Sequence, residues 1–129
     1  MTTLPDRCEV VVIGGGVIGV SVAYHLAEAG IQDVVLVERK ELTSGTTWHA
    51  AGLVGQLRSS INMTKLARYT SELYRGLEAE TGQATGYRQC GSMSIAATAE
   101  RFEELKRSAS MAKVFDLEVN VLSVAEIAE

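Results

Sequence analysis

Apolar and polar positions in the first forty residues predict a strand, a helix and a second strand. Residues 8–13 form a β-branched run without alternation, which is typical of a strand covered on both faces of a parallel sheet. Over residues 17–29 apolar side chains recur at helical spacing, and Gly30 follows as a stop signal. Residues 33–38 form a second strand of the buried type. We therefore expect a parallel strand, helix, strand unit over residues 8–38.

Two longer helices are predicted in the second half of the chain. From Asn62 the apolar or small residues follow the i, i+3, i+4, i+7 pattern of an amphipathic helix that ends near Gly82. Thr98 can cap a further helix. The expected buried stripe of that helix consists of Phe102, Leu105, Ala109 and Ala112.

Shorter elements are predicted beside these helices. Residues 87–98 alternate in part, which indicates one or two short strands of another sheet, and residues 117–122 indicate a short strand. Ser123 and Glu126 have the reciprocal spacing of a capping box, which predicts the start of one more helix.

Composition and charge exclude several classes of partner. The chain has 129 residues, 47% of them apolar and 22% charged, which is the balance of one ordinary globular domain. A formal net charge of −4 gives no reason to expect nucleic acid or an anionic membrane surface, since both attract basic proteins. With two cysteines, Cys8 and Cys90, a disulfide scaffold or a structural metal site is not expected.

The N-terminal residues indicate no targeting signal or membrane segment. Residues 1–9 are polar and short, without the features of a secretory signal or a transit peptide. A cytoplasmic location is therefore expected, with the mitochondrial matrix as the alternative if a transit peptide is missing from this chain. The longest apolar stretch, residues 10–23, contains four glycines and is shorter than the ~20 residues that span a bilayer.

A glycine motif lies between the first predicted strand and the first predicted helix. Residues 14–19, Gly-Gly-Gly-Val-Ile-Gly, match the GxGxxG pattern of dinucleotide-binding turns. Gly14 allows the tight turn, Gly16 lets the backbone approach a pyrophosphate, and Gly19 lets the helix pack closely on the strand. The amides at the start of the helix then form an anion site that requires no basic side chain.

Glu38 at the end of the second predicted strand supports this interpretation. It follows Gly19 by nineteen residues, where its carboxylate can accept hydrogen bonds from both hydroxyls of an adenosine ribose and would repel a 2′-phosphate. The alternative is a glycine-rich turn without a ligand. The motif and the acid together favour dinucleotide binding, although this fingerprint does not separate FAD from NAD.

Residues 42–52, Leu-Thr-Ser-Gly-Thr-Thr-Trp-His-Ala-Ala-Gly, carry a more specific pattern. With the preceding Val-Val-Leu-Val-Glu-Arg-Lys, this segment resembles the dimethylglycine dehydrogenase and sarcosine dehydrogenase family, in the D-amino-acid-oxidase-like superfamily. The resemblance continues through Gly-Leu-Glu-Ala-Glu-Thr-Gly at residues 76–82 and Cys-Gly-Ser-Met-Ser-Ile at residues 90–95. It implies an α/β, Rossmann-type FAD-binding fold, of which residues 1–129 would be the N-terminal part. Residues 42–56 would be the flavin-attachment loop, and residues 85–129 the start of substrate-domain elements.

The resemblance also implies which residues contact the flavin. In that family the histidine of this motif is bonded to the 8α-methyl of FAD, and the matching residue is His49; the alternative is an ordinary surface or core histidine. The other cofactor-binding residues expected from the motif and the resemblance are Gly14, Gly15, Gly16, Val17, Ile18, Gly19, Glu38, Arg39, Gly45, Thr46, Thr47, Trp48, Ala50, Ala51, Gly52 and Leu53. No catalytic residue is located in this segment.

By resemblance, the full-length protein would oxidise an N-methylated amine such as dimethylglycine, sarcosine or a methylaminobutanoate. A hydride would pass from the N-methyl carbon to FAD, and the product would be formaldehyde. In members with a folate-binding C-terminal region, tetrahydrofolate would capture the carbon instead. The electron acceptor stays open. Two alternatives remain: a non-catalytic relative, like the regulatory subunit of pyruvate dehydrogenase phosphatase, and an NAD-dependent dehydrogenase.

Overall fold

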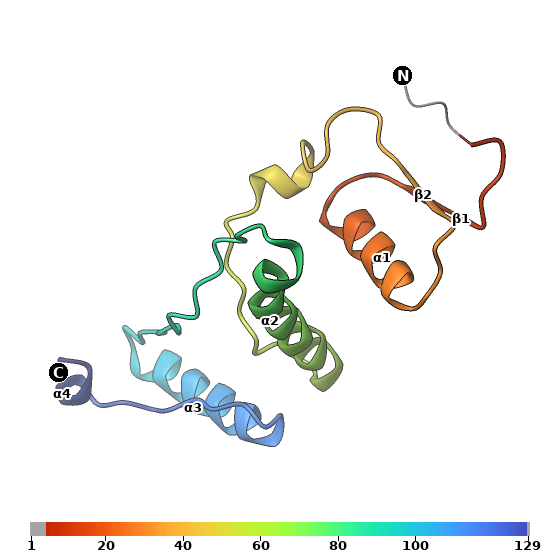
Figure 1. The fold of residues 1–129 in the computed structure, drawn as a ribbon. Coiled ribbons are helices and arrows are strands. Elements are labelled where there is room, and N and C mark those ends of the chain that lie inside the picture. Colours follow the sequence, from red (N-terminus) through yellow and green to blue (C-terminus); the bar gives the residue numbers. More distant parts are fainter. Residues whose placement is uncertain (1–4, 129) are drawn as a thin grey trace. The chain divides into compact units, whose positions relative to one another are not determined.

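The computed structural model describes residues 5–128, which divide into two compact units after Leu53 (Figure 1). Residues 1–4 of the polar N-terminal stretch and Glu129 lie outside the described residues. The first unit contains β1 (Val10–Ile13), α1 (Val17–Glu28), β2 (Val34–Val37) and the 3₁₀ turn η1 (Thr46–His49). The second contains α2 (Ile61–Thr81), α3 (Ala99–Val114) and α4 (Val124–Ile127).

The two strands of the first unit pair in parallel. Val10 lies opposite Val34 and Ile13 opposite Val37, so the four residues of each strand are in register. One further bond, from the amide of Gly14 to the carbonyl of Val37 at 2.8 Å, continues the pairing into the glycine turn. The predicted strand, helix, strand unit and the α/β class of the Rossmann-type fold are confirmed.

Helix α1 packs against both strands and covers one face of them. Val12 is buried at 8% exposure, whereas its neighbours Val11 and Ile13 are 54% and 85% exposed. Because adjacent strand residues point to opposite faces, the face that carries Val11 and Ile13 has no cover among residues 5–128. The expectation that the first strand is covered on both faces is therefore not met within the described residues.

Helix α2 is capped at both ends, and it ends at Gly82 as predicted. The side chain of Ser60 accepts a hydrogen bond from the amide of Met63, and Gly82 ends the helix in the left-handed conformation at φ 73°. The buried Thr64 hydroxyl bonds to the backbone amide and carbonyl of Arg58, which holds the segment before the helix against its first turn.

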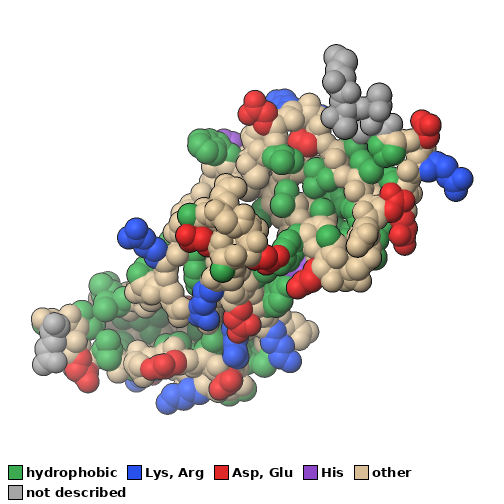
Figure 2. All heavy atoms as spheres, in the orientation of Figure 1, with side chains coloured by type: hydrophobic (Ala, Val, Ile, Leu, Met, Phe, Trp, Pro, Cys, Tyr) green, Lys and Arg blue, Asp and Glu red, His purple; other side chains and the backbone are tan. Residues whose placement is uncertain are grey.

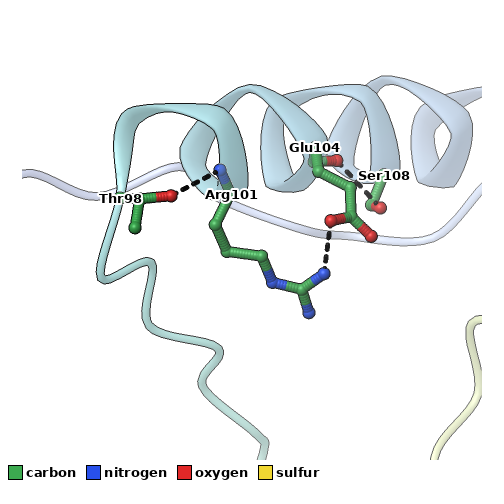
Figure 3. Close-up of polar contacts among 4 residues, drawn as sticks. All are labelled: Thr98, Arg101, Glu104 and Ser108. Atoms are coloured by element: carbon green, nitrogen blue, oxygen red, sulfur yellow. Dashed lines mark hydrogen bonds and ion pairs between the residues drawn. The ribbon is translucent and has the colours of Figure 1, made fainter.

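Helix α3 begins at the predicted cap but buries less than its predicted stripe. The Thr98 hydroxyl accepts a hydrogen bond from the amide of Arg101 (Figure 3). Ala109 and Ala112 are buried, whereas Phe102 is 40% exposed, so the stripe is covered only toward the C-terminal end of the helix. The predicted capping box of Ser123 and Glu126 is present at the start of α4.

The strands predicted over residues 87–98 and 117–122 are wrong. Both segments lack regular secondary structure, and within residues 5–128 the sheet consists of β1 and β2 alone. An alternating pattern indicates which face of a segment is apolar, whereas a strand also requires a hydrogen-bonding partner at its edge. No described segment takes that place.

Apolar side chains remain at the surface of both units. Figure 2 shows hydrophobic side chains among polar ones on the face in view. The most exposed of them are Leu53, Val124 and Ile13, at 89%, 87% and 85%. Among the described residues no helix is long and apolar enough to cross a membrane, and no cluster of His, Cys, Asp and Glu could hold a metal ion.

Candidate functional site

The glycine turn between β1 and α1 has the geometry that its sequence predicts. Gly14 has φ +102°, a backbone conformation that residues other than glycine rarely adopt, and it turns the chain from β1 toward α1. A Cβ on Gly19 would overlap the carbonyl oxygen of Gly14 and lie 3.4 Å from Cγ1 of Val12. The third glycine therefore allows α1 to lie directly on the turn and on β1, as expected.

The start of α1 presents backbone amides that have no protein partner. Gly16 is the residue that caps the helix, and with no side chain it supplies no capping hydrogen bond. Among the described residues nothing accepts a hydrogen bond from the amides of Gly16 and Ile18. These donors and the positive end of the helix dipole are what an anionic group binds at a helix N-terminus.

Glu38 is bound to the glycine turn through both of its carboxylate oxygens. One oxygen accepts a hydrogen bond from the amide of Gly15 at 2.7 Å, and the other accepts one from the amide of Lys40 at 2.9 Å. The bond from Gly15, then the bond from Lys40, and more weakly the charge of Arg39, hold the pKa of Glu38 below its ordinary value. The side chain is therefore an anion at neutral pH.

Thr47 connects the η1 turn to the start of α1. Its hydroxyl oxygen accepts a hydrogen bond from the amide of Val17 at 2.9 Å, across thirty residues of sequence. A second bond, from the amide of Thr43 to the carbonyl of Gly15 at 2.9 Å, holds the preceding loop on the same turn. The segment with the most specific sequence pattern thus lies against the glycine motif.

These elements enclose a cleft of about 710 Å³ within the first unit. A volume of this size is in the range of small-molecule sites, roughly 300–1,000 Å³. The predicted site residues that line it are Gly14, Gly16, Val17, Ile18, Gly19, Glu38, Arg39, Gly45, Thr46, Thr47 and Ala50. Most of the predicted set is therefore brought together on one surface.

The remaining predicted residues do not line the cleft. Gly15 lies behind it, with its amide on Glu38, and the others are Trp48, His49, Ala51, Gly52 and Leu53. The Trp48 side chain is 78% exposed, and His49 and residues 51–53 are exposed as well. His49 nevertheless follows Thr47 by two residues in the same 3₁₀ turn, so it is carried by an element that does line the cleft.

Sequence reasoning missed several residues of the cleft. These are Val12, Ile13, Val22, Lys40, Thr43 and Ser44. Lys40 and Thr43 could have been predicted from the sequence, since they lie between two predicted parts of the site, Glu38 and the Thr-Thr-Trp-His segment. Ile18 and Val22, which continue the helical spacing of α1, are 78% and 46% exposed and face the cleft, because Gly19 is the residue that packs on the sheet.

Comparison with known families matches residues 9–129 to the FAD dependent oxidoreductase family. The chain is 54% identical over 101 residues to dimethylglycine dehydrogenase, mitochondrial, of Rattus norvegicus, covering 78% of this chain and 12% of that protein. It is 48% identical over 124 residues to sarcosine dehydrogenase, mitochondrial, of Mus musculus, covering 95% of this chain and 14% of that protein. The chain thus spans about one-eighth of the length of these relatives.

Two further similarities bear on the fold and on the alternatives. The pyruvate dehydrogenase phosphatase regulatory subunit, mitochondrial, of Mus musculus is 43% identical over 126 residues, covering 98% of this chain and 14% of that protein. Among solved structures, L-proline dehydrogenase from P. horikoshii superimposes with a TM-score of 0.78 at 28% identity, covering 87% of this chain and 29% of that one.

Proposed function

Since the chain belongs to the family of FAD-dependent oxidoreductases, we propose that it binds the adenosine diphosphate half of FAD as part of an enzyme that oxidises N-methylated amines. The single observation that carries the proposal is the cleft between the start of α1 and Glu38. It brings together the unpartnered amides of Gly16 and Ile18 and the ionised carboxylate of Glu38 within the first unit, and Gly16 places no side chain between them.

The residues of the cleft fit an adenine dinucleotide. The amides of Gly16 and Ile18 would donate to the diphosphate, and the absent side chain of Gly16 leaves room for that approach. Glu38 would accept hydrogen bonds from the ribose hydroxyls, because a carboxylate has about four acceptor sites and the two backbone amides use one on each oxygen. Its negative charge would disfavour a ribose that carries a 2′-phosphate.

The substrate class follows from the relatives. One is named for dimethylglycine and another for sarcosine, and both compounds are amino acids with a methyl group on nitrogen. When bound, FAD would supply the acceptor for the hydride that leaves the N-methyl carbon. Water would then add to the resulting iminium, releasing formaldehyde, a proton and the demethylated amine. In a full-length protein with a folate-binding region, tetrahydrofolate would take the one-carbon unit. The catalytic residues are expected outside this segment.

His49 is the proposed site of the covalent flavin bond. It stands on η1 two residues after Thr47, and it is exposed rather than held in the interior. The imidazole of His49 would form the bond to the 8α carbon of a flavin that the diphosphate contacts already hold. The 8α-methyl group and the imidazole would each lose a proton, and the flavin itself would take up the two electrons released, to be reoxidised by its electron acceptor. The likeness of the Thr-Trp-His-Ala-Ala-Gly segment to the dimethylglycine and sarcosine dehydrogenases is the main support for this bond.

We further propose the mitochondrial matrix as the location of the protein. The rat dimethylglycine dehydrogenase and the mouse sarcosine dehydrogenase are both named as mitochondrial. The expectation of a cytoplasmic location finds no support in these relatives, whereas the mitochondrial alternative agrees with them.

Acid precipitation of the full-length protein tests the proposal. We expect the wild-type pellet to keep its yellow colour, and a tryptic peptide that contains residue 49 to carry the mass of the flavin. His49→Ala should release all of its flavin into the acid supernatant. His25→Ala is the matched control, since His25 bonds to the carbonyl of Ser21 within α1, and it should keep the acid-stable flavin.

The outcomes separate the parts of the proposal. Flavin that is wholly released from the wild type by acid would overturn the covalent bond alone. A full-length protein that takes up NAD and not FAD would favour the NAD-dependent alternative. If bound FAD is bleached by neither dimethylglycine nor sarcosine under anaerobic conditions, the non-catalytic alternative, exemplified by the phosphatase regulatory subunit, is favoured.

A further inference from the structure

Three contacts hold the loop after β2 on the glycine turn. The side chain of Leu42 lies over Gly15, where a Cβ would be 2.5 Å from its Cδ2. The Thr43 amide donates to the Gly15 carbonyl at 2.9 Å, and the Thr47 hydroxyl accepts from the Val17 amide at 2.9 Å. Of the three contacts, the bond to the Thr47 hydroxyl is the one made by a polar side chain, and Thr47 directly precedes Trp48 and His49.

The Thr47 hydroxyl takes the place of a helix cap that α1 lacks. Helices usually begin with Ser, Thr, Asp or Asn, whose side chain accepts from a first-turn amide. Gly16 has no such side chain, and a Cβ there would lie 3.2 Å from the Thr47 hydroxyl oxygen. The Thr47 hydroxyl thus lies close to where a local capping side chain would lie, and a residue thirty positions after Val17 supplies the missing acceptor.

A hydroxyl suits this place better than a carboxylate. Asp would cap the helix equally well, but its charge would repel the diphosphate that the same amides are proposed to bind. A threonine hydroxyl accepts from the Val17 amide and still has its own proton to donate into the cleft that it lines. It is therefore compatible with an anion at the start of α1.

We propose that Thr47 is a positioning residue, whose hydroxyl cap on α1 fixes the η1 turn and with it the placement of His49 relative to the diphosphate site. The role toward flavin rests on the function proposed above, whereas the cap itself does not. The hydrogen bond from Val17 to Thr47 then couples anion binding to the order of the η1 turn. An anion bound at the start of α1 stabilises the helix end to which the turn is attached, and the ordered turn holds His49 at a fixed distance from the diphosphate site. Binding and ordering should therefore favour each other.

Hydrogen–deuterium exchange of the full-length protein, without and with ADP, tests this proposal. The variants are Thr47→Val, which has the same shape without the hydroxyl, and Thr47→Ser, which restores it. Thr70→Val is the matched control, since Thr70 lies in α2 outside the cleft and its exposed hydroxyl donates to the carbonyl of Leu66 within that helix. In Thr47→Val we expect the amides of peptides covering residues 14–20 and 44–50 to exchange about tenfold faster than in the wild type, because the loss of a helix cap destabilises the start of a helix by about this factor. Thr47→Ser should return to the wild-type rate, and ADP should slow exchange at residues 44–50 in the wild type but not in Thr47→Val.

Other outcomes would overturn the proposal. If Thr47→Val exchanges like the wild type, the hydroxyl does not cap α1. If Thr70→Val speeds exchange in the same peptides equally, the effect reflects a general loss of stability and not the loss of the cap. In the same preparations the yield of acid-stable flavin per bound FAD should fall in Thr47→Val and recover in Thr47→Ser. If the wild type binds neither ADP nor FAD while the exchange rates without ligand are as expected for all variants, the proposed function is wrong and the cap stands.

Discussion

The backbone at Gly19 lies so close to the carbonyl of Gly14 that a Cβ would overlap the oxygen and lie 3.0 Å from the carbonyl carbon. The obstacle is a backbone group, which cannot rotate away as a side chain does. This contact places the start of α1 directly on the turn that leaves β1, and so directs its free amides into the cleft.

Gly19→Ala is expected to destabilise the protein by about 1–3 kcal/mol, the range for an overpacked site. Ala favours helix formation, but the clash with Gly14 outweighs that gain. Gly76→Ala is the matched control, since Gly76 lies inside α2 with no atom within 4 Å of an added Cβ, and it should stabilise by about 0.5–1 kcal/mol. Urea denaturation of the full-length variants, followed by circular dichroism, measures both changes. Equal stability of Gly19→Ala and wild type would contradict the packing argument.

Gly16→Val should lower the FAD content of the full-length protein at least about tenfold, because the branched side chain fills the approach to the diphosphate. The backbone of Gly16, at φ −77°, is accessible to other residues, but a Cβ there would lie 3.2 Å from the Thr47 hydroxyl oxygen, so circular dichroism of the variant must show that its fold is retained. Gly76→Val, inside α2 and with no atom within 4 Å of an added Cβ, should keep its flavin. Flavin absorbance per protein after gel filtration decides between these results, and an unchanged content in Gly16→Val would refute the phosphate cradle.

Glu38→Gln should change how stability depends on pH. The pKa of Glu38 is lowered in the folded protein, chiefly by the amides of Gly15 and Lys40, so ionised Glu38 favours the folded state. That contribution is fully present above the ordinary carboxyl pKa of 4.5 and is lost as the pH falls through the lowered folded value. The wild type should therefore exceed Glu38→Gln in stability at pH 7, and the difference should disappear in acid.

Denaturation midpoints of wild type and Glu38→Gln from pH 7 to about pH 3 measure this difference. Glu100 and Glu126 also have lowered pKa values, through hydrogen bonds at the starts of α3 and α4. Both variants retain these two groups, so the comparison isolates Glu38. A constant gap across the whole pH range would show that the hydrogen bonds to Glu38 do not depend on its charge.

Thr98→Ala is expected to cost about 1 kcal/mol of stability, because the amide of Arg101 loses its acceptor at the start of α3. Thr98→Ser, which keeps the hydroxyl acceptor, should be nearly as stable as the wild type. The neighbouring ion pair of Arg101 and Glu104 lies on the exposed side of the helix (Figure 3), so Glu104→Gln should change stability by less than about 0.5 kcal/mol. Thermal unfolding of the three variants ranks these effects, and a larger loss in Glu104→Gln than in Thr98→Ala would contradict the assignment of the cap.

The sequence alone determined the elements whose signals are local. The strand, helix, strand unit follows from a β-branched run, a glycine turn and a helical repeat, and the starts of α3 and α4 follow from Thr98 and Ser123, which cap their own next turn. The three glycines of the motif were assigned their roles for the same reason, since the strain and the close approach arise within a few residues.

Contacts between residues far apart in sequence were decided only by the tertiary structure. Residues 87–98 and 117–122 alternate like strands, yet a strand depends on a partner that its own sequence does not specify. Likewise, no local pattern joins Thr47 to Val17 or Glu38 to Gly15, because each bond closes a loop of more than twenty residues. Local patterns choose the elements, whereas the packing of α1 on β1 and β2 determines which of their side chains meet at the cleft.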